Sequence, residues 1–371
     1  MSEPSLHLAV CIPTYRRPRL LGLLLDDLRR QTVSIDRLII VDGDPSSADV
    51  AETLKQQPCA ARELLYVPSN HANLPYQRFL GWKAASGAAR LLYLDDDLRL
   101  LSAESVATLL RPLRADRGRV VGITTEFALP REDGDQDRGV RGGINRPTHG
   151  SCNGLRVWNG FRRFGSSHRI PAGGLSPAGH RRPPAVSNKP YGRVGCLRGG
   201  VMAYRMSAIT RDCFSDALFA MGERGWGLGE DTLLSRRIGS RGVLLTAFQA
   251  GIVHPNGHAP VAYRRDAFGR GYATAFSRRL LNDHFRGFDP PQWPDRLALI
   301  KSYAINASLS WVRALRPADG KARAFAAGYT LGALRGTLQA PASRRLTPGI
   351  DWRADAESAL ARTRILIAAS L

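Results

Sequence analysis

Short apolar runs alternate with longer amphipathic segments along the first 125 residues of the chain. Several runs are almost continuously apolar, as in strands buried on both faces of a sheet: residues 7–13, 38–41, 63–67, 90–94 and 120–124. Between them, apolar positions recur at helical spacing over residues 18–31, 48–57, 75–86 and 102–113. Strands that alternate with helices predict βα units around a parallel sheet, which places the chain in the α/β class.

The pattern changes in the second half of the chain. Residues 138–211 hold fourteen basic side chains and no Asp or Glu, with many glycines and prolines, which predicts long loops. Regular structure returns with strand-like runs at 199–204, 243–247 and 251–254 and a helical pattern at 230–240; beyond residue 260 the chain is helical and Arg-rich. We predict an α/β domain over residues 1–259, with a basic Gly-, Pro- and Arg-rich insert at about 131–198, and a helical region over residues 260–371.

The composition is that of an ordinary globular protein. Of 371 residues, 43% are hydrophobic and 23% are charged, and every apolar run is much shorter than the roughly 20 residues that cross a bilayer. The first residues lack the basic and apolar regions of a signal peptide, and the five cysteines have no zinc-site spacing. These features predict a cytoplasmic protein with reduced cysteines.

The net charge of +21 is the abnormal quantity, and it comes almost entirely from arginine. Residues 1–130 are nearly neutral, so the excess lies in residues 131–371. A basic half of this kind favours an anionic partner or an anionic membrane surface, although a genome that favours Arg, Ala and Gly would produce the same excess. The helical segment at 298–315 could lie on a bilayer, but we expect its apolar face to be buried on the α/β domain.

Three consecutive carboxylates, Asp95, Asp96 and Asp97, directly follow an apolar strand pattern. Ligands bind at the carboxyl edge of open parallel sheets, and alternate residues of an extended chain point the same way. Asp95 and Asp97 would then offer two hard oxygen donors to one cation, which suits Mg²⁺ or Mn²⁺ bridging to phosphate oxygens. The alternative is a solvated acidic turn that only caps the strand.

A second acidic pair, Glu230 and Asp231, begins a helical pattern after the glycine-rich segment 225–229. Glycines let a substrate approach the backbone, and a carboxylate at a helix start is held firmly enough to act as a general base. Acidic residues also interact favourably with the N-terminal end of a helix dipole, which is the structural alternative. His254 ends a short apolar run. A single histidine at a strand end usually has no special function, so only its occurrence together with the other motifs suggests one.

These motifs occur together in the order and spacing of one family. They are the segments 10–17 (VCIPTYRR), 40–43 (IVDG), 73–81, 94–97 and 229–231, and finally His254. Over about residues 7–275 the chain resembles the family 2 glycosyltransferases of the GT-A fold. The resemblance implies an α/β nucleotide-diphospho-sugar transferase sandwich with a mixed, mostly parallel sheet, followed here by the C-terminal helical region.

The resemblance also implies roles for particular residues. It assigns donor binding to Pro13, Tyr15, Arg17, Asp42, Asp95, Asp96 and Gly200. It assigns the divalent cation to Asp95, Asp97 and His254. Asp231 would be the catalytic base with Glu230 as its orienting neighbour, and Trp226 would be an aromatic residue on the acceptor side.

The implied activity is an inverting transfer of one sugar from a nucleotide-diphosphate sugar, most commonly a UDP-sugar, to an acceptor hydroxyl, with Mg²⁺ or Mn²⁺ as cofactor. The Gln-x-x-Arg-Trp segment and the membrane spans of the processive members are missing from the sequence, which favours one transfer per acceptor. The acceptor would be a glycan, a lipid-linked molecule or a small molecule. The enzyme would be cytoplasmic, with peripheral contact at the inner face of an anionic membrane.

Two other classes remain open on the sequence alone. A basic nucleic-acid-binding protein on an α/β scaffold would account for the charge, but no zinc-finger or RNP motif is visible, so nucleic acid is the less favoured partner. A sugar nucleotidyltransferase would need a glycine-rich phosphate loop with a following lysine after the first strand. That place holds the segment 14–17 (TYRR) instead.

Overall fold

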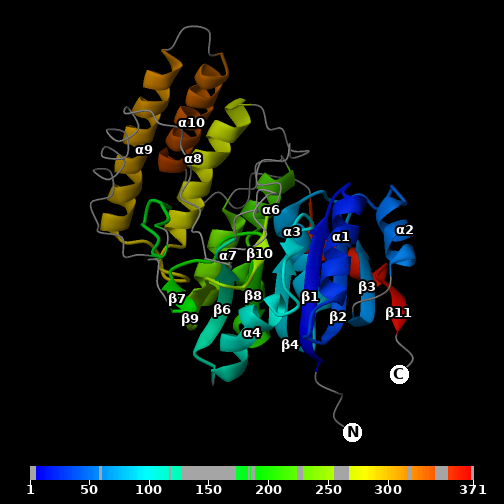
Figure 1. Ribbon diagram of the computed structural model, residues 1–371. Helices are drawn as coiled ribbons and strands as arrows, with labels where there is room; N and C mark the ends of the chain where they lie inside the picture. The colour runs from blue at the N-terminus through cyan, green and yellow to red at the C-terminus, as the bar shows by residue number, and fades with distance from the viewer. Residues whose placement is uncertain are drawn as a thin grey trace, which may run out of the picture.

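The structure is a computed structural model that describes residues 6–57, 61–116, 118–127, 173–182, 184, 189–223, 229–254, 267–315, 320–338 and 350–368. Within these residues a nine-stranded sheet has the order β11, β3, β2, β1, β4, β8, β6, β9, β7 (Figure 1). The bounds are β1 Leu6–Thr14, β2 Ile35–Asp42, β3 Ala61–Pro68, β4 Ala88–Leu94, β6 Val120–Thr125, β7 Tyr191–Val194, β8 Val201–Arg205, β9 Val243–Ala247 and β11 Arg364–Ala368.

Most strands of this sheet run in the same direction. β1 pairs in parallel with β2 and β4, β2 pairs in parallel with β3, and β6 pairs in parallel with β9. β8 runs antiparallel between β4 and β6, while β7 and β11 run antiparallel to β9 and β3 at the two edges. The mixed, mostly parallel sheet expected from the sequence is therefore confirmed.

Helices cover both faces of the sheet, because successive strand residues point to opposite sides. The bounds are α1 Pro18–Arg29, α2 Asp49–Gln56, α3 Leu74–Ala84, α4 Ser105–Ala115, α6 Asp216–Glu223, α7 Glu230–Gly239 and α11 Trp352–Ala361. Val10 and Ile12 of β1 face a core shared with α1, α2 and α4. Ala9 and Cys11 face a second core shared with α3, α6, α7 and α11. Gly81 of α3 lies so close to the Cys11 side chain that a Cβ would not fit there.

The carboxyl ends of the parallel strands form the edge where the predicted site residues lie. β1 ends at Thr14, β2 ends at Asp42, and β4 ends directly before Asp95. The Gln77 amide of α3 ties two of these ends together, because it donates to the backbone oxygens of Thr14 at 2.8 Å and Val41 at 2.9 Å. The helix that follows β3 therefore fixes the spacing of the strand ends.

Three helices form a bundle beside the sheet: α8 Ala267–Asp283, α9 Trp293–Ala314 and α10 Gly320–Leu338 (Figure 1). One side of α9, with Leu299 and Tyr303, packs inside this bundle. The other side is exposed, so the expectation that the apolar face of segment 298–315 is buried on the α/β domain is wrong. Among the described helices, none has the length and hydropathy needed to span a membrane.

The last helix and strand leave the bundle and return to the sheet. The Trp352 ring of α11 lies 5.0 Å from the rings of both His71 and Tyr76, and β11 extends the sheet beyond β3. The helices expected beyond residue 260 are present, whereas β11 and β7 are strands that the sequence analysis does not predict. The division of the chain into two domains at residue 260 stays a prediction. The segment beyond residue 260 also supplies β11 to the sheet of the first domain.

Candidate active site

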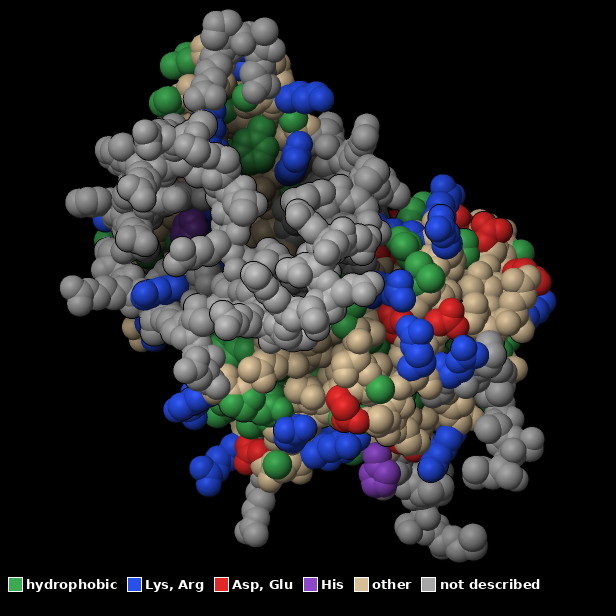
Figure 2. Space-filling model, viewed as in Figure 1, with side chains coloured by type: hydrophobic (Ala, Val, Ile, Leu, Met, Phe, Trp, Pro, Cys, Tyr) green, Lys and Arg blue, Asp and Glu red, His purple; other side chains and the backbone are tan. Residues whose placement is uncertain are grey.

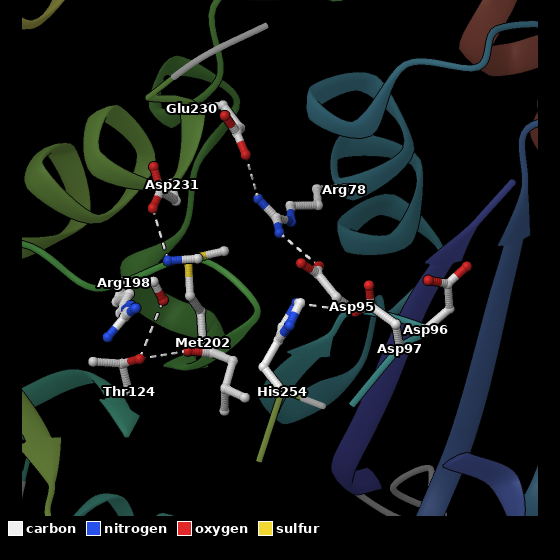
Figure 3. Close-up of polar contacts among 12 residues, drawn as sticks. Arg78, Asp95, Asp96, Asp97, Thr124, Arg198, Met202, Glu230, Asp231 and His254 are labelled. Carbon is white, nitrogen blue, oxygen red and sulfur yellow. Dashed lines mark hydrogen bonds and ion pairs between the residues drawn. The ribbon is translucent and has the colours of Figure 1, made fainter. Parts of the chain in front are cut away.

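The three aspartates that follow β4 have different partners, and Figure 3 shows Asp95 facing Arg78 and Asp97 facing His254. The Asp95 backbone N–H donates to the Gly200 oxygen at 2.9 Å, and the Asp95 side chain points to α3. Asp96 and Asp97 share one cation, because Arg17 Nη1 lies 3.0 Å from Asp96 Oδ1 and 3.0 Å from Asp97 Oδ2. The acidic segment therefore belongs to two separate ion-pair systems.

Burial and neighbouring charges set the protonation of Asp96 and Asp97. Burial raises the pKa of Asp96 to about 6, although Arg17 and the Thr14 hydroxyl, 2.8 Å from Oδ2, favour its ionised form. Burial also opposes ionisation of Asp97, but contact with His254 and the charge of Arg17 outweigh the burial and lower its pKa. Asp97 is therefore the more firmly ionised of the two.

His254 reaches this corner through a two-stranded sheet of β5 (Arg99–Leu100) and β10 (Ile252–Val253). Its Nε2 lies 3.2 Å from Asp97 Oδ1, and this contact raises the pKa of His254 while burial lowers it. Two buried atoms of the pair, Asp97 Oδ1 and His254 Nδ1, make no hydrogen bond of good geometry with the protein. Among the described residues the ion-pair partner of Asp97 Oδ1 is the imidazole itself, so a bound cation would take the place of the proton between them.

The residues assigned to the cation come together only in part. In the described part of the chain, no three His, Cys, Asp or Glu side chains lie close enough to form a complete cation site. Asp97 and His254 meet, while Asp95 is bound to an arginine. Mg²⁺ is commonly held by one or two carboxylates together with substrate phosphates, and carboxylate and imidazole both suit first-row metals. The Asp97–His254 pair therefore fits a cation that binds together with a diphosphate.

The residues assigned to the nucleotide surround the ends of β1 and β2. Pro13 is buried in β1, whereas Tyr15 and Arg17 are partly exposed just beyond the strand. Asp42 is fully buried: its Oδ2 accepts the Tyr66 hydroxyl at 2.8 Å, and its Oδ1 accepts a backbone N–H at 2.9 Å. Burial raises the pKa of Asp42. A nucleotide would have to displace Tyr66 to bind this carboxylate directly.

A buried arginine that the sequence analysis does not predict connects the two acidic groups (Figure 3). Arg78 of α3 is 1% exposed, and its terminal nitrogens lie 2.9 Å from Asp95 Oδ1 and 2.9 Å from Glu230 Oε1. Burial opposes its charge, but Asp95, Glu230 and Asp231 outweigh the burial and raise the pKa of Arg78. The available signal was a lone arginine inside the otherwise uncharged, buried stretch 75–81.

Asp231 is held from several sides at the start of α7. Both of its oxygens lie 2.8 Å from Arg181 Nη2, the Gly199 N–H donates to Oδ2 at 2.7 Å, and the Thr232 N–H donates to Oδ1 at 2.7 Å. Burial opposes ionisation, but Arg181 and Arg78 outweigh it and lower the pKa of Asp231. Asp231 is therefore ionised, and both of its oxygens already have partners.

Glu230 has the opposite electrostatic character. Burial and the negative charge of Asp231 both raise the pKa of Glu230, and Arg78 opposes them. Glycines shape the backbone around the pair: Gly229 directly before α7 has a φ of 79° and Gly200 has a φ of 95°. Such values favour glycine. The acidic pair thus combines a carboxylate that ionises readily with one that resists ionisation.

The insert contributes to this side of the site. It is described at residues 173–182, 184 and 189–198, and Arg181 belongs to the first of these segments. No sequence motif singles out Arg181 among the many arginines of the insert. Trp226, the predicted acceptor-side aromatic residue, lies outside the described residues.

Part of the chain is similar to known proteins. Residues 9–149 match the family model described as glycosyl transferase family 2, while no curated protein matches the chain. A mannosyltransferase, PcManGT from Pyrobaculum calidifontis, solved with GDP-Man and Mn²⁺, is 14% identical with a TM-score of 0.47, and the match covers 90% of this chain and 87% of that chain. Residues 1–349 of TarS from S. aureus give 13% identity and a TM-score of 0.47, covering 90% of this chain and 81% of that chain.

The family match covers β1 to β4 and the acidic segment 94–97, and therefore the part of the candidate site at the carboxyl ends of these strands. Residues 9–149 are thus similar to the family 2 glycosyltransferases, and the protein is a glycosyltransferase. The resemblance drawn from the sequence is confirmed over this segment. The roles of the individual site residues stay predictions.

Proposed function

We propose that the protein is an inverting, non-processive glycosyltransferase that moves one sugar from a nucleotide-diphosphate sugar to an acceptor hydroxyl. UDP-sugars are the first donors to test. The observation that carries the proposal is the link between two carboxylate groups across Arg78: Asp95 lies at the sheet edge, and Glu230 lies at the start of α7. A donor at the sheet edge and an acceptor beside α7 would meet at this buried cation.

The reaction would be a single displacement. The acceptor oxygen bonds to C1 of the sugar while the bond from C1 to the diphosphate oxygen breaks, and the diphosphate leaves with the electron pair. Attack from the face opposite the leaving group inverts the configuration at C1. A divalent cation, Mg²⁺ or Mn²⁺, would be held by Asp97 and His254 and would supply charge neutralisation for the diphosphate.

In this proposal Asp231 takes the proton of the acceptor hydroxyl. The N–H groups of Gly199 and Thr232 orient its carboxylate, and Arg181 keeps it ionised. Arg181 covers both oxygens, so it must release one of them for the acceptor to bind. Glu230 holds Arg78 in place and does not contact the acceptor proton.

The assignment of the base is tested with Asp231→Asn and Glu230→Gln. Removal of a general base slows the chemical step by roughly 10²- to 10⁴-fold and leaves donor binding nearly intact. We expect a kcat loss in this range for Asp231→Asn and a smaller loss for Glu230→Gln, with thermal unfolding measured to verify the fold. The reverse order would assign the base to Glu230, and two active variants would make the pair purely structural.

The cation site is tested by binding rather than turnover. We expect Mn²⁺ to tighten the binding of a nucleoside diphosphate to the wild-type protein in calorimetry, and this gain to disappear in Asp97→Asn. Asp49→Asn is the matched control, because Asp49 is an exposed carboxylate on α2. Equal gains in all three proteins, or full activity in the presence of EDTA, would contradict a cation at this place.

Contact with an anionic membrane is the second part of the proposal, and it suits a lipid-linked acceptor better than a glycan or a small molecule. Large apolar side chains lie exposed in a stripe on α9 and α10, at Trp293, Leu297, Ile300, Trp311, Leu315, Leu331, Leu334 and Leu338. Exposed basic residues lie on the same helices: Lys301, Lys321 and Arg323. Figure 2 shows hydrophobic and basic side chains together at the end of the bundle. Apolar and basic side chains on one helical face are typical of interfacial binding, here at the inner face of the membrane.

This contact is tested by flotation with lipid vesicles. We expect the protein to bind phosphatidylglycerol-containing vesicles, to bind neutral vesicles weakly, and to dissociate as salt rises, because exposed charges are screened. Leu315→Asp and Leu338→Asp should reduce the binding, since these side chains are 80% and 79% exposed. Leu101→Asp, at a 60% exposed leucine away from the bundle, is the control. Equal binding by all variants would contradict the stripe as the contact.

A further inference from the structure

A pocket lies away from the candidate active site. It has a volume of about 550 Å³ and is bounded by α6, the end of α7, α8, the start of α9 and the end of α10. Its walls combine aromatic side chains with arginines: Phe214, Phe276, Phe288, Arg237, Arg279 and Arg335. None of the aspartates after β4 lines it, nor do Glu230, Asp231 and His254.

Arg237 is the unusual member of this pocket, because it is a buried cation without a carboxylate. It is 7% exposed; its Nη1 donates to the Phe214 oxygen at 3.0 Å, and its Nη2 lies 2.7 Å from His284 Nε2. Its Nε has no hydrogen-bond partner, and no described carboxylate forms an ion pair with it. Burial lowers the pKa of Arg237.

The neighbouring groups offset this charge only in part. Burial and the charge of Arg237 lower the pKa of His284 to about 4, so the imidazole is neutral near pH 7 and supplies no negative charge. Arg237 lies in the last turn of α7, where the helix dipole favours a cation by less than a full ion pair would. Burying a charge without a counter-charge is unfavourable, so Arg237 destabilises the fold unless a negative group binds beside it.

Two of the three aspartates that line the pocket are paired with other arginines, Asp216 with Arg211 and Asp283 with two guanidinium groups, while Asp289 has no ion pair among the described residues. Asp283 Oδ1 lies 3.0 Å from Arg279 and 2.5 Å from Arg296, so one carboxylate serves two guanidinium groups. Arg335 donates to the Tyr272 hydroxyl at 3.1 Å, a neutral partner. The pocket thus has more positive than negative charge along its polar wall.

We propose that this pocket binds a phosphate group attached to an apolar or aromatic portion. The guanidinium fork matches phosphate oxygens, and a phosphate would supply the counter-charge that Arg237 lacks. The rings of Phe214, Phe276 and Phe288 would contact the apolar portion. The site is separate from the proposed donor and cation residues and does not depend on the proposed reaction.

The test is calorimetric binding of phenyl phosphate, with inorganic phosphate as competitor and without any turnover. We expect saturable binding by the wild-type protein and at least a tenfold weaker affinity for Arg237→Gln, because hydrogen bonds to charged groups carry an energy of this order. Arg323→Gln, an exposed arginine of α10 outside the pocket, should keep the wild-type affinity. Equal losses in both variants would show a diffuse charge effect and overturn the site.

Two further variants keep the test decisive. Phe288→Asp places a negative charge at a rim residue that is 47% exposed, so it should weaken binding without disturbing the buried arginine. Arg17→Gln alters the donor side and should leave phenyl phosphate affinity unchanged; a loss there would move the binding to the donor site and overturn the proposal. No binding by the folded wild-type protein would do the same.

Two sources of the phosphate group are distinguished by steady-state kinetics once an acceptor is known. Competition between phenyl phosphate and the acceptor would identify the ligand as a phosphate carried by the acceptor itself. A change in rate without such competition would identify a free phosphate compound acting from a second site. Because binding is measured without transfer, failure of the proposed reaction would leave the pocket result intact.

Discussion

The donor side and the acceptor side of the candidate site hold their carboxylates in different ways. On the donor side, Asp96 and Asp97 contact residues at or just beyond the neighbouring end of β1, namely Thr14 and Arg17. On the acceptor side, Asp231 is held by an arginine of the insert, and Glu230 is held by an arginine of α3. The donor-side contacts follow from strand order, whereas the acceptor-side contacts require helices and an insert to pack correctly.

The two sides also differ in charge balance. The donor side sets Arg17 and His254 against Asp96 and Asp97, and a bound cation there would take the place of the proton between Asp97 and His254. The acceptor side already contains the cations Arg78 and Arg181 beside its acidic pair. A cation would therefore bind the donor side by replacing a proton, whereas an acceptor would bind the other side only after Arg181 moves away from an oxygen of Asp231.

Removal of Arg78 is expected to have the largest effect, because this residue contacts both sides of the site. Arg78→Met leaves Glu230 and Asp95 without their buried counter-ion, and loss of one partner of a buried ion pair costs about 3–5 kcal/mol. We expect the free energy of unfolding, measured with urea, to fall by about this amount. Arg62→Gln is the control, because Arg62 is an exposed partner of Asp36 and such pairs contribute about 0–1 kcal/mol. A loss no larger than that of the control would mean that Arg78 is not the centre of the site.

A second experiment tests how Arg181 of the insert affects Asp231. Arg181 lowers the pKa of Asp231, so Arg181→Gln should raise that pKa, and the acidic limb of the pH profile of kcat/KM should move to higher pH by about 1 unit or more. Arg193→Gln, at an exposed position of β7, should leave the limb in place. An unchanged limb in Arg181→Gln would separate Asp231 from proton transfer.

The smallest expected effect concerns the loop before α3. His71 Nδ1 lies 2.9 Å from Glu223, and its Nε2 lies 3.6 Å from Asp355. The contact with Glu223 raises the pKa of His71, so its contribution to stability is complete below pH 6.5 and is lost as pH rises through the raised value. Over this window, wild-type stability should fall by about 1 kcal/mol more than that of His71→Gln in urea unfolding. Parallel pH dependences of the two proteins would count against this contact.

Most of the fold could be predicted from the sequence because its strands are buried on both faces and leave continuous apolar runs. The run at 243–247 coincides with β9, and the run at 120–124 differs from β6 by one residue. The short strands β5 and β7 and the edge strand β11 could not be found this way. β5 has two residues and β7 has four, which is too short to leave a clear pattern, and Arg364–Ala368 lies in a segment whose surroundings are helical.

Some residues of the candidate site could also be predicted from the sequence, and others could not. The carboxylates Asp97 and Asp231 and the imidazole of His254 lie at element ends, where sequence patterns point to them. Arg78 and Arg181 act through contacts that depend on how α3 and the insert pack, and one arginine among many carries no distinguishing signal. Charged partners of a buried acid are therefore harder to predict than the acid itself.

The pairing of β11 with β3 has a consequence for the order in which the protein is made. The other strands of the sheet are complete by Ala247, whereas β11 begins at Arg364. At the usual rate of about 5–20 residues per second, a growing chain would expose the edge of β3 for roughly 15 to 60 seconds before β11 is made. Uncovered strand edges pair readily with other chains. The newly made enzyme would therefore be prone to aggregate until the segment 364–368 has been made, and loss of this segment would make that exposure permanent.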